Sequence, residues 1–216
     1  MMHDAAGDLE ELESRLRNGD KQALAELFAR HRERLWRMIN FRLDRRLQGR
    51  IDPDDLLQES YLAAAQRLEH FRERPAMSAF VWLRLIASQT LVDAHRHHLG
   101  AKLRNAEREV ALEAGHYRPT TSASLAIQLV EQLTSPSQIA IRAEVLQQVE
   151  YAITEMDPLD QEILALRHFE ELTNSETAEV LGIQQKAASI RYVRALRRLK
   201  AILAQLPGFA EDLPDA

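Results

Sequence analysis

The sequence predicts an all-α protein, and three observations support this prediction. The composition is rich in Leu, Ala, Glu and Arg, and the 216 residues include only seven glycines and seven prolines. Apolar residues recur at helical spacing over most of the chain. No segment alternates between polar and apolar residues as a half-buried strand would. We therefore expect two small helical domains, an N-terminal helical bundle and a C-terminal helix-turn-helix, joined by a partly helical linker.

Shifts in composition divide the chain into five parts. We expect an acidic N-terminal segment over residues 1–20, a first helical domain over 21–104, a linker over 105–137, a helix-turn-helix domain over 138–204 and a polar tail over 205–216.

The first domain begins with a long amphipathic helix. Asp20 can serve as its N-cap, because an aspartate side chain accepts hydrogen bonds from the backbone N–H groups of the first turn. Apolar residues then recur at helical spacing from Leu24 to Leu43. Gly49 is expected to break this helix.

Two further helices complete the first domain. The run Asp52-Pro53-Asp54-Asp55 combines a capping carboxylate, a proline at the first helical position and negative charge at the positive end of the helix dipole. This pattern predicts a helix from there to about Leu68. Pro75 marks a loop, and a third helix is expected over about Ser78–His98. Trp82 of that helix is more often a core residue than a platform for base stacking.

The second half of the chain shows weaker signals at first. A short helix is expected over Leu125–Leu133. The sequence Ser135-Pro136-Ser137-Gln138 has the pattern of a capping box and begins a helix that extends to about Glu155. Asp157-Pro158 begins the next helix, which continues to Phe169.

The segment Thr173–Lys200 predicts a helix-turn-helix. Thr173 and Glu176 have the spacing of a capping box, and Gly182 supplies the permissive backbone that a sharp turn needs. Every charged residue of the second helix, Gln184–Lys200, is positive. One side of that helix is apolar and would face the core, through Ala188, Tyr192, Ala195 and Leu199. A capped short helix, a glycine turn and a cationic second helix together indicate binding to duplex DNA.

The composition excludes several classes of protein. The chain has no cysteine, so it has no disulfide and no thiolate metal site. We find neither a membrane-spanning apolar run nor a secretory signal and expect a cytoplasmic location. Motifs of phosphate loops, zinc proteases and serine hydrolases are missing, so we expect neither enzymatic activity nor a cofactor. His95, His97 and His98 lie close together, but neighbouring residues on one helix diverge, and we expect no metal there.

The charges are unevenly distributed along the chain. The net charge is −5, yet acidic segments such as residues 1–14 and 155–179 are separate from the basic segments 95–108 and 186–200. Basic surfaces suit phosphate, and acidic surfaces suit a basic protein, so two kinds of partner are expected.

Three segments, in this order, match the motifs of one family. Asp52–Tyr61, DPDDLLQESY, is similar to DxEDLxQExF. Trp82–Gln89, WLRLIASQ, with Asp93 and Arg96, is similar to WLxxIAxNxxxDxxR. Asp157–Glu170 and the helix-turn-helix resemble the domain that reads the promoter −35 element. The family is that of bacterial RNA polymerase sigma factors of the extracytoplasmic-function (ECF) type, within the sigma-70 family. The resemblance covers about Leu24–Leu103 and Ile139–Leu203.

This resemblance implies a non-enzymatic initiation factor with two main partners, core RNA polymerase (β′ clamp helices and β subunit) and promoter DNA. The resemblance also allows a third partner, an anti-sigma factor. Polymerase docking is assigned to Asp52, Asp54, Asp55, Leu56, Gln58 and Glu59. Melting and readout of the −10 element are assigned to Phe71, Arg72, Arg74, Trp82, Arg84, Gln89 and Arg96. Readout of the −35 element is assigned to Gln185, Lys186, Ser189, Arg191, Arg194 and Arg198.

The chain departs from the family pattern at three positions. Gln89 stands where the −10 segment usually has Asn, Ala79 stands where an aromatic residue is common, and Ser189 stands where the recognition helix often has Lys. These departures affect the expected base preference. The sequences around His168 and Ala187 also resemble sigma factors of planctomycete bacteria.

Two other functions fit the residues without the resemblance. A dimeric helix-turn-helix regulator with an N-terminal sensing domain would bind a palindromic site. A helical adaptor would bind protein alone, and charge reversal on its basic helix would not affect any DNA-dependent assay.

Overall fold

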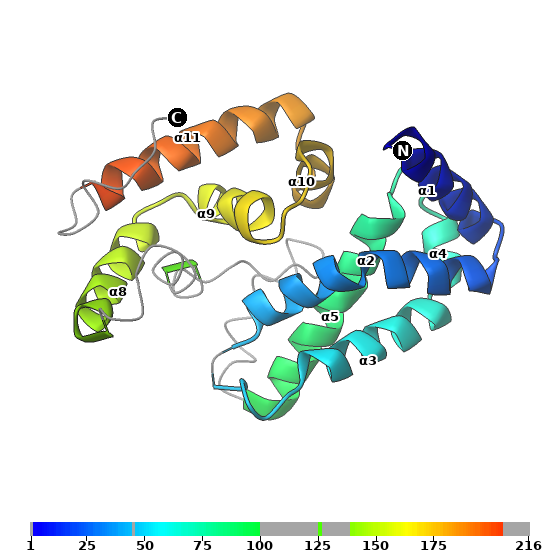
Figure 1. Ribbon diagram of the computed structural model, residues 1–216, viewed down its shortest axis with the longest axis horizontal. Helices are drawn as coiled ribbons and strands as arrows, with labels where there is room; N and C mark the ends of the chain where they lie inside the picture. Colours follow the sequence, from blue (N-terminus) through cyan, green and yellow to red (C-terminus); the bar gives the residue numbers. More distant parts are fainter. Residues whose placement is uncertain (1, 45, 100–124, 127–138, 205–216) are drawn as a thin grey trace. The chain divides into compact units, whose positions relative to one another are not determined.

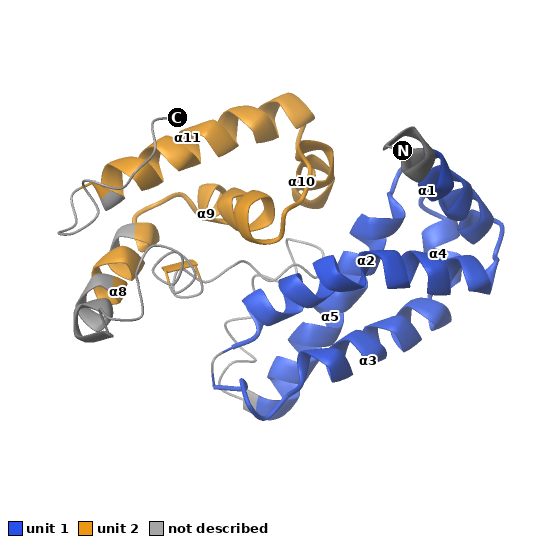
Figure 2. Cartoon of the chain, viewed as in Figure 1, with its two compact units in different colours: residues 1–118 blue, residues 119–216 orange. Residues whose placement is uncertain are grey.

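The computed structural model describes residues 2–44, 46–99, 125–126 and 139–204, which fall in two compact units, Met1–Arg118 and Pro119–Ala216 (Figure 2). Within these ranges the secondary structure is helical (Figure 1). An isolated bridge between Gln48 and Ile51 is the sole β-type pairing in the described residues. The predicted all-α fold with two domains is confirmed. None of the described helices is both long and apolar enough to cross a membrane.

The first unit is a helical bundle built around α2. Its helices are α1 (Met2–Arg17), α2 (Lys21–Arg42), α3 (Pro53–Gln66), α4 (Leu68–Arg72) and α5 (Ala79–Leu99). Helix α2 packs against α1, α3 and α5, and α3 also packs against α5. The side chains that fill the space between them are fully buried and mostly aliphatic, among them Leu27, Leu35, Ile39, Leu83 and Leu91. Burial of this apolar surface is the main force that holds the bundle together.

The expected starts of α2 and α3 are confirmed. The Asp20 carboxylate accepts a hydrogen bond from Gln22 N at 2.8 Å, and the Asp52 carboxylate accepts one from Asp54 N at 2.9 Å. The expected end of α2 at Gly49 is wrong, because the helix ends at Arg42. There the backbone becomes extended, and the next free N–H, that of Asp44, donates to Nε2 of the buried His95 at 3.0 Å.

Two parts of the first unit differ from the expected layout. The acidic N-terminal segment contains α1, whose Leu12 and Leu16 are buried, and α1 packs against α2. The helix expected to reach Leu68 ends at Gln66, and a separate short helix follows. Phe71 lies in this short helix, α4.

The second unit is held around its last helix. It contains α8 (Ile139–Thr154), α9 (Pro158–Leu164), a π-helical turn η2 (Ala165–Phe169), α10 (Asn174–Leu181) and α11 (Gln185–Leu203). Helix α11 packs against α8, α9 and α10. Leu125 and Ala126 are helical and buried, whereas the rest of the helix expected over Leu125–Leu133, the capping box at Ser135 and the polar tail lie outside the described residues.

The helix-turn-helix has the local geometry that its sequence predicts. Thr173 Oγ1 accepts a hydrogen bond from Glu176 N at 3.2 Å, and the Glu176 carboxylate accepts one from Thr173 N at 2.7 Å, which is a complete capping box. Gly182 ends α10 in the left-handed region, with φ 62°. The Ile183 N–H then donates to the carbonyl of Ala178 at 3.0 Å, so the turn also satisfies the end of α10.

The left-handed backbone at Gly182 leads to a prediction that has a matched control. A Cβ built at Gly182 meets no atom within 4 Å, so Gly182→Ala would cost only the backbone term of about 1 kcal/mol. Gly7 lies inside α1 with equally open space, so Gly7→Ala should instead stabilise by about 0.5–1 kcal/mol.

The two units can be followed separately in the full chain. Both tryptophans, Trp36 and Trp82, lie in the first unit, so urea unfolding read by tryptophan fluorescence reports that unit. Hydrogen exchange of the α10 and α11 amides reports the second. Equal effects of the two substitutions on both signals would contradict the prediction.

Candidate functional site

The outward face of α11 is the basic surface expected to bind DNA. Ala188, Ala195 and Leu199 are buried on the opposite side, as predicted. The exposed residues of the first turns include Gln185, Lys186 and Ser189, which were all predicted as DNA-binding residues. No carboxylate occurs anywhere in α11. The accessible part of this helix can therefore approach a polyanion without like-charge repulsion of its own.

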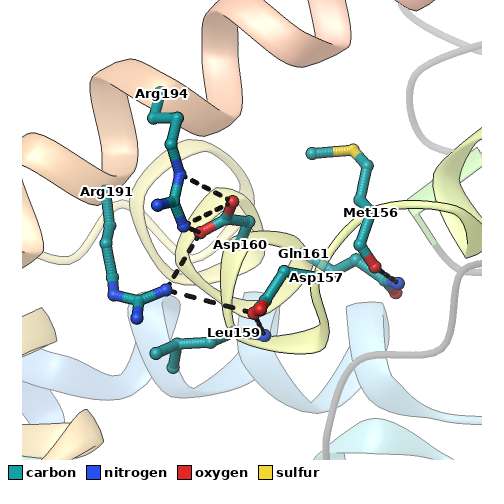
Figure 3. A network of polar contacts seen from close by, with 7 residues as sticks. All are labelled: Met156, Asp157, Leu159, Asp160, Gln161, Arg191 and Arg194. Carbon is teal, nitrogen blue, oxygen red and sulfur yellow. Dashed lines mark hydrogen bonds and ion pairs between the residues drawn. The ribbon is translucent and has the colours of Figure 1, made fainter.

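A buried carboxylate fixes the inner flank of α11. Asp160 of α9 is 2% exposed, and its oxygens accept hydrogen bonds from Arg194 Nη2 at 2.7 and 2.9 Å and from Arg194 Nε at 3.1 Å (Figure 3). Arg191 Nη1 lies 3.3 Å from the same carboxylate and 4.0 Å from Asp157. The Asp160 hydrogen bond also raises the pKa of Arg194 above its ordinary value. A fork of donors from two arginines gives this charge the partners that burial requires.

This network shows that arginines of α11 assigned to −35 readout also contact neighbouring elements of the second unit. Arg191 and Arg194 turn toward α9, and Arg198 Nη2 donates to the carbonyl of Glu155 at 2.8 Å. Spacing alone did not reveal this, because a helical wheel does not show which neighbouring element holds a counter-charge. Their contact with DNA, predicted from the sequence, remains a prediction.

Sequence reasoning missed the residues that occupy the centre of the outward face. Ile190 and Val193 are 60% and 45% exposed, and Arg197 is exposed beside them. Their spacing with Lys186, in steps of four, three and four residues, was the available signal.

Three of the residues assigned to −10 readout are buried. Phe71, Trp82 and Arg84 are 0%, 3% and 2% exposed, and the rings of Phe71 and Trp82 lie 5.0 Å apart. A DNA strand cannot reach enclosed side chains, so the expectation of direct contact is corrected for these three in this conformation. They form the support beneath the surface.

The other four −10 residues lie at the surface of the first unit. Arg72 and Arg74 are exposed, and Gln89 and Arg96 are half-buried on α5. Arg72 is paired with Glu69 at 2.9 Å, Arg96 with Asp93 at 3.6 Å, and the Gln89 amide oxygen accepts a hydrogen bond from Arg67. All of these ion pairs are partly exposed, so a polyanion could displace them at low cost.

Helix α1 holds the loop between α4 and α5. Arg17 Nη2 donates to the carbonyl of Met77 at 2.6 Å, Nη1 donates to that of Arg74 at 3.3 Å, and the guanidinium lies 4.3 Å from the centre of the Phe71 ring. The Glu13 carboxylate accepts a hydrogen bond from Ala79 N at 3.0 Å, at the start of α5. The acidic segment thus supports a loop that includes Arg74.

The residues assigned to polymerase docking divide between surface and core. Asp52, Asp54, Asp55, Gln58 and Glu59 are exposed. Leu56 is 2% exposed, which corrects its assignment to a contact surface, since it packs inside the bundle. Asp52 caps α3, and Asp54 pairs with Arg32. The remaining exposed residues of this set, Asp55, Gln58 and Glu59, lie further along α3.

A groove of about 490 Å³ brings two predicted sites together between α3 and α5. Its lining includes Asp55 and Glu59 of the predicted docking surface and Gln89 of the predicted −10 surface. His97 and His98 line its end, while His95 is buried and bonded to Asp44. Across the described ranges, no group of three His, Cys, Asp or Glu side chains has the geometry to hold a metal ion.

The Asp160 network predicts a stability effect with a near neighbour as control. Asp160→Asn should destabilise the second unit by about 2 kcal/mol, because two arginines lose their shared anion and a buried site is left with a poorer acceptor. Asp157→Asn should cost far less, since Asp157 is exposed and asparagine is an equally good N-cap. Hydrogen exchange of the α11 amides checks this, and equal effects of the two variants would refute it.

The loop support by α1 predicts a local effect of Arg17→Ala. Loss of two hydrogen bonds and one ring contact should cost about 1 kcal/mol and accelerate amide exchange over residues 73–81. Arg15→Ala removes the same charge from the same helix, but Arg15 pairs with Asp20 and Glu26 instead of the loop. Exchange in the loop that is equally fast in both variants would exclude the proposed support.

Comparison with known proteins agrees with both units. Residues 27–99 match the family "Sigma-70 region 2", and residues 152–201 match "Sigma-70, region 4". The RNA polymerase sigma factor CarQ of Myxococcus xanthus is 27% identical over 192 residues, which cover 89% of this chain and 95% of CarQ. The ECF RNA polymerase sigma factor SigD of Mycobacterium tuberculosis is 29% identical over 182 residues, covering 84% and 77% of the two chains.

A solved structure, that of CnrH in complex with the cytosolic domain of CnrY, covers 90% of this chain and 96% of that chain, with 22% identity and a TM-score of 0.48. The two sequence families match segments that together make up more than half of the chain, in the order region 2 and then region 4. The chain therefore belongs to the sigma-70 family, and the relatives that it resembles are RNA polymerase sigma factors, SigD among them of the ECF type.

Proposed function

We propose that this sigma factor directs core RNA polymerase to promoters by three contacts, namely docking through α3, readout of a melted −10 strand near the α4–α5 loop, and readout of the −35 duplex by α11. The observation that carries the proposal is the outward face of α11, which combines cations with apolar side chains and has no carboxylate. In a chain that contains both sigma regions, this surface has the character of a major-groove reader.

The exposed carboxylates of α3 support docking on a basic surface of polymerase. Asp55 and Glu59 lie one helical turn apart, and both line the groove beside α5. Their negative charge would repel DNA phosphate in the free protein and would be covered once polymerase is bound. The free protein should therefore bind promoter duplexes weakly, and tight specific binding without polymerase would contradict this mechanism.

The surface for the −10 strand would lie on the supported loop and on α5. Arg72 and Arg74 supply positive charge, and Gln89 supplies an amide that can pair with a base edge. Gln89 is already bonded to Arg67, so readout would require that contact to open. Phe71 and Trp82 would keep this surface in shape from within.

The family resemblance suggests further general properties, which are proposals for this chain. We infer a non-enzymatic, cytoplasmic protein that acts without a cofactor, with an anti-sigma factor as a further partner on the strength of the family resemblance alone. A planctomycete source is proposed from the sequences around His168 and Ala187.

Charge reversal on α3 tests the docking contact. The double variant Asp55→Lys/Glu59→Lys should bind core polymerase about tenfold more weakly, because two exposed attractive charges become repulsive. Glu33→Lys on α2 is the control, since its side chain is 82% exposed and its loss removes only a surface pair with Arg37. Titration of labelled protein with core polymerase, at two salt concentrations, measures the difference. Equal affinity of the double variant and the control would remove α3 from the docking surface.

Transcription in vitro tests the function as a whole. Core polymerase with this protein should give promoter-dependent transcripts from a genomic library, and core polymerase alone should not. No such transcript would refute the proposal. A stable homodimer that binds a palindromic site without polymerase would favour the regulator that the sequence left open.

A further inference from the structure

The centre of the outward face of α11 is apolar. In the described parts of the chain the exposed large apolar side chains are Leu62, Tyr151, Ile190 and Val193, and two of these four lie on this helix. Ile190 and Val193 are three residues apart, so they lie side by side on one face. Both are β-branched and therefore stiff at χ1, so little side-chain freedom would be lost on contact. Apolar side chains that are grouped on one face and bordered by polar residues are a feature of partner-binding surfaces.

Positive charge lies at both ends of this apolar pair. Lys186 precedes Ile190 by four residues and Arg197 follows Val193 by four, so the four residues form one continuous stripe, which we call the outer stripe. Arg191, Arg194 and Arg198 lie off this stripe and bind Asp160 and the Glu155 carbonyl. Lys186 and Arg197 of the outer stripe take no part in these contacts, although Arg194 and Arg198 are exposed as well. The cations of the outer stripe and the lack of any carboxylate in α11 favour an anionic partner over a basic one.

The chemistry of the stripe matches the major groove of DNA. Lys186 and Arg197 can reach the phosphates at the groove walls while the residues between them face the base edges. The main apolar group that the bases present there is the C5-methyl of thymine. We propose that Ile190 and Val193 contact thymine methyl groups and thereby specify thymine in the −35 element. This inference rests on the proposed −35 readout by α11.

Removal of one methyl group tests the contact at the DNA side. Selection from promoters with a randomised −35 region, with the full protein bound to core polymerase, first identifies the preferred sequence. Each thymine of that sequence is then replaced by deoxyuridine, which pairs identically and lacks only the methyl group. Loss of one buried methyl group should weaken promoter binding about fourfold at one or two positions.

Substitution of the two side chains tests the contact at the protein side. Ile190→Ala and Val193→Ala should abolish the difference between thymine and deoxyuridine, whereas Lys186→Ala should weaken binding to all sequences and keep the difference. Both apolar residues are exposed and alanine is a better helix former, so the fold should be unaffected, which circular dichroism checks. Tyr151→Ala removes an even more exposed side chain, from α8, and should retain the full thymine response.

The outcomes separate this inference from the function on which it rests. Promoter-dependent binding with no response to deoxyuridine, or a response that both alanine variants retain, would overturn the thymine contact and leave the sigma function intact. No promoter-dependent binding of any duplex would instead refute the proposed function itself.

Discussion

Asp160 lies almost fully inside the second unit, and its charge needs partners there. The arginines of α11 supply them, because a carboxylate removed from water is stable only when donors surround it. Since Arg191 and Arg194 lie on one flank of α11, this pairing fixes the rotation of the helix about its own axis. The outer stripe is exposed as a consequence. The orientation of the surface proposed to bind DNA therefore depends on a contact made at the flank of the helix.

The first unit uses the same division between support and surface. Trp82 is a motif residue of the family, yet it is enclosed, as are Phe71 and Arg84, which the sequence also assigned to −10 readout. Their burial is consistent with a supporting role, since a surface loop needs a rigid base to present its side chains. Helix α1 adds to this base through Arg17 and Glu13, which hold the two ends of the loop before α5. An acidic segment with no family motif thus has a structural role.

Local signals predicted the secondary structure well where they had a direct physical cause. The caps at Asp20 and Asp52 and the capping box at Thr173 depend on side chains within three residues of the backbone they stabilise, and the turn at Gly182 depends on a residue without a Cβ. The end of α2 was predicted poorly because it depends on a residue distant in sequence. Nε2 of His95 accepts a hydrogen bond from the N–H of Asp44, which lies 51 residues earlier in the chain. Helix α1 was missed because its acidic composition hid two core leucines.

The sequence by itself determined the fold class, the order of the helices and the family, since these follow from periodicity, caps and motif spacing that are all encoded locally. Only the tertiary structure decided which motif residues are accessible. Whether Leu56 or Glu59 faces outward, and whether Arg194 or Arg197 pairs with the buried Asp160, depends on packing between helices. The physical reason is that burial and charge pairing are properties of neighbours in space, which a linear pattern does not specify.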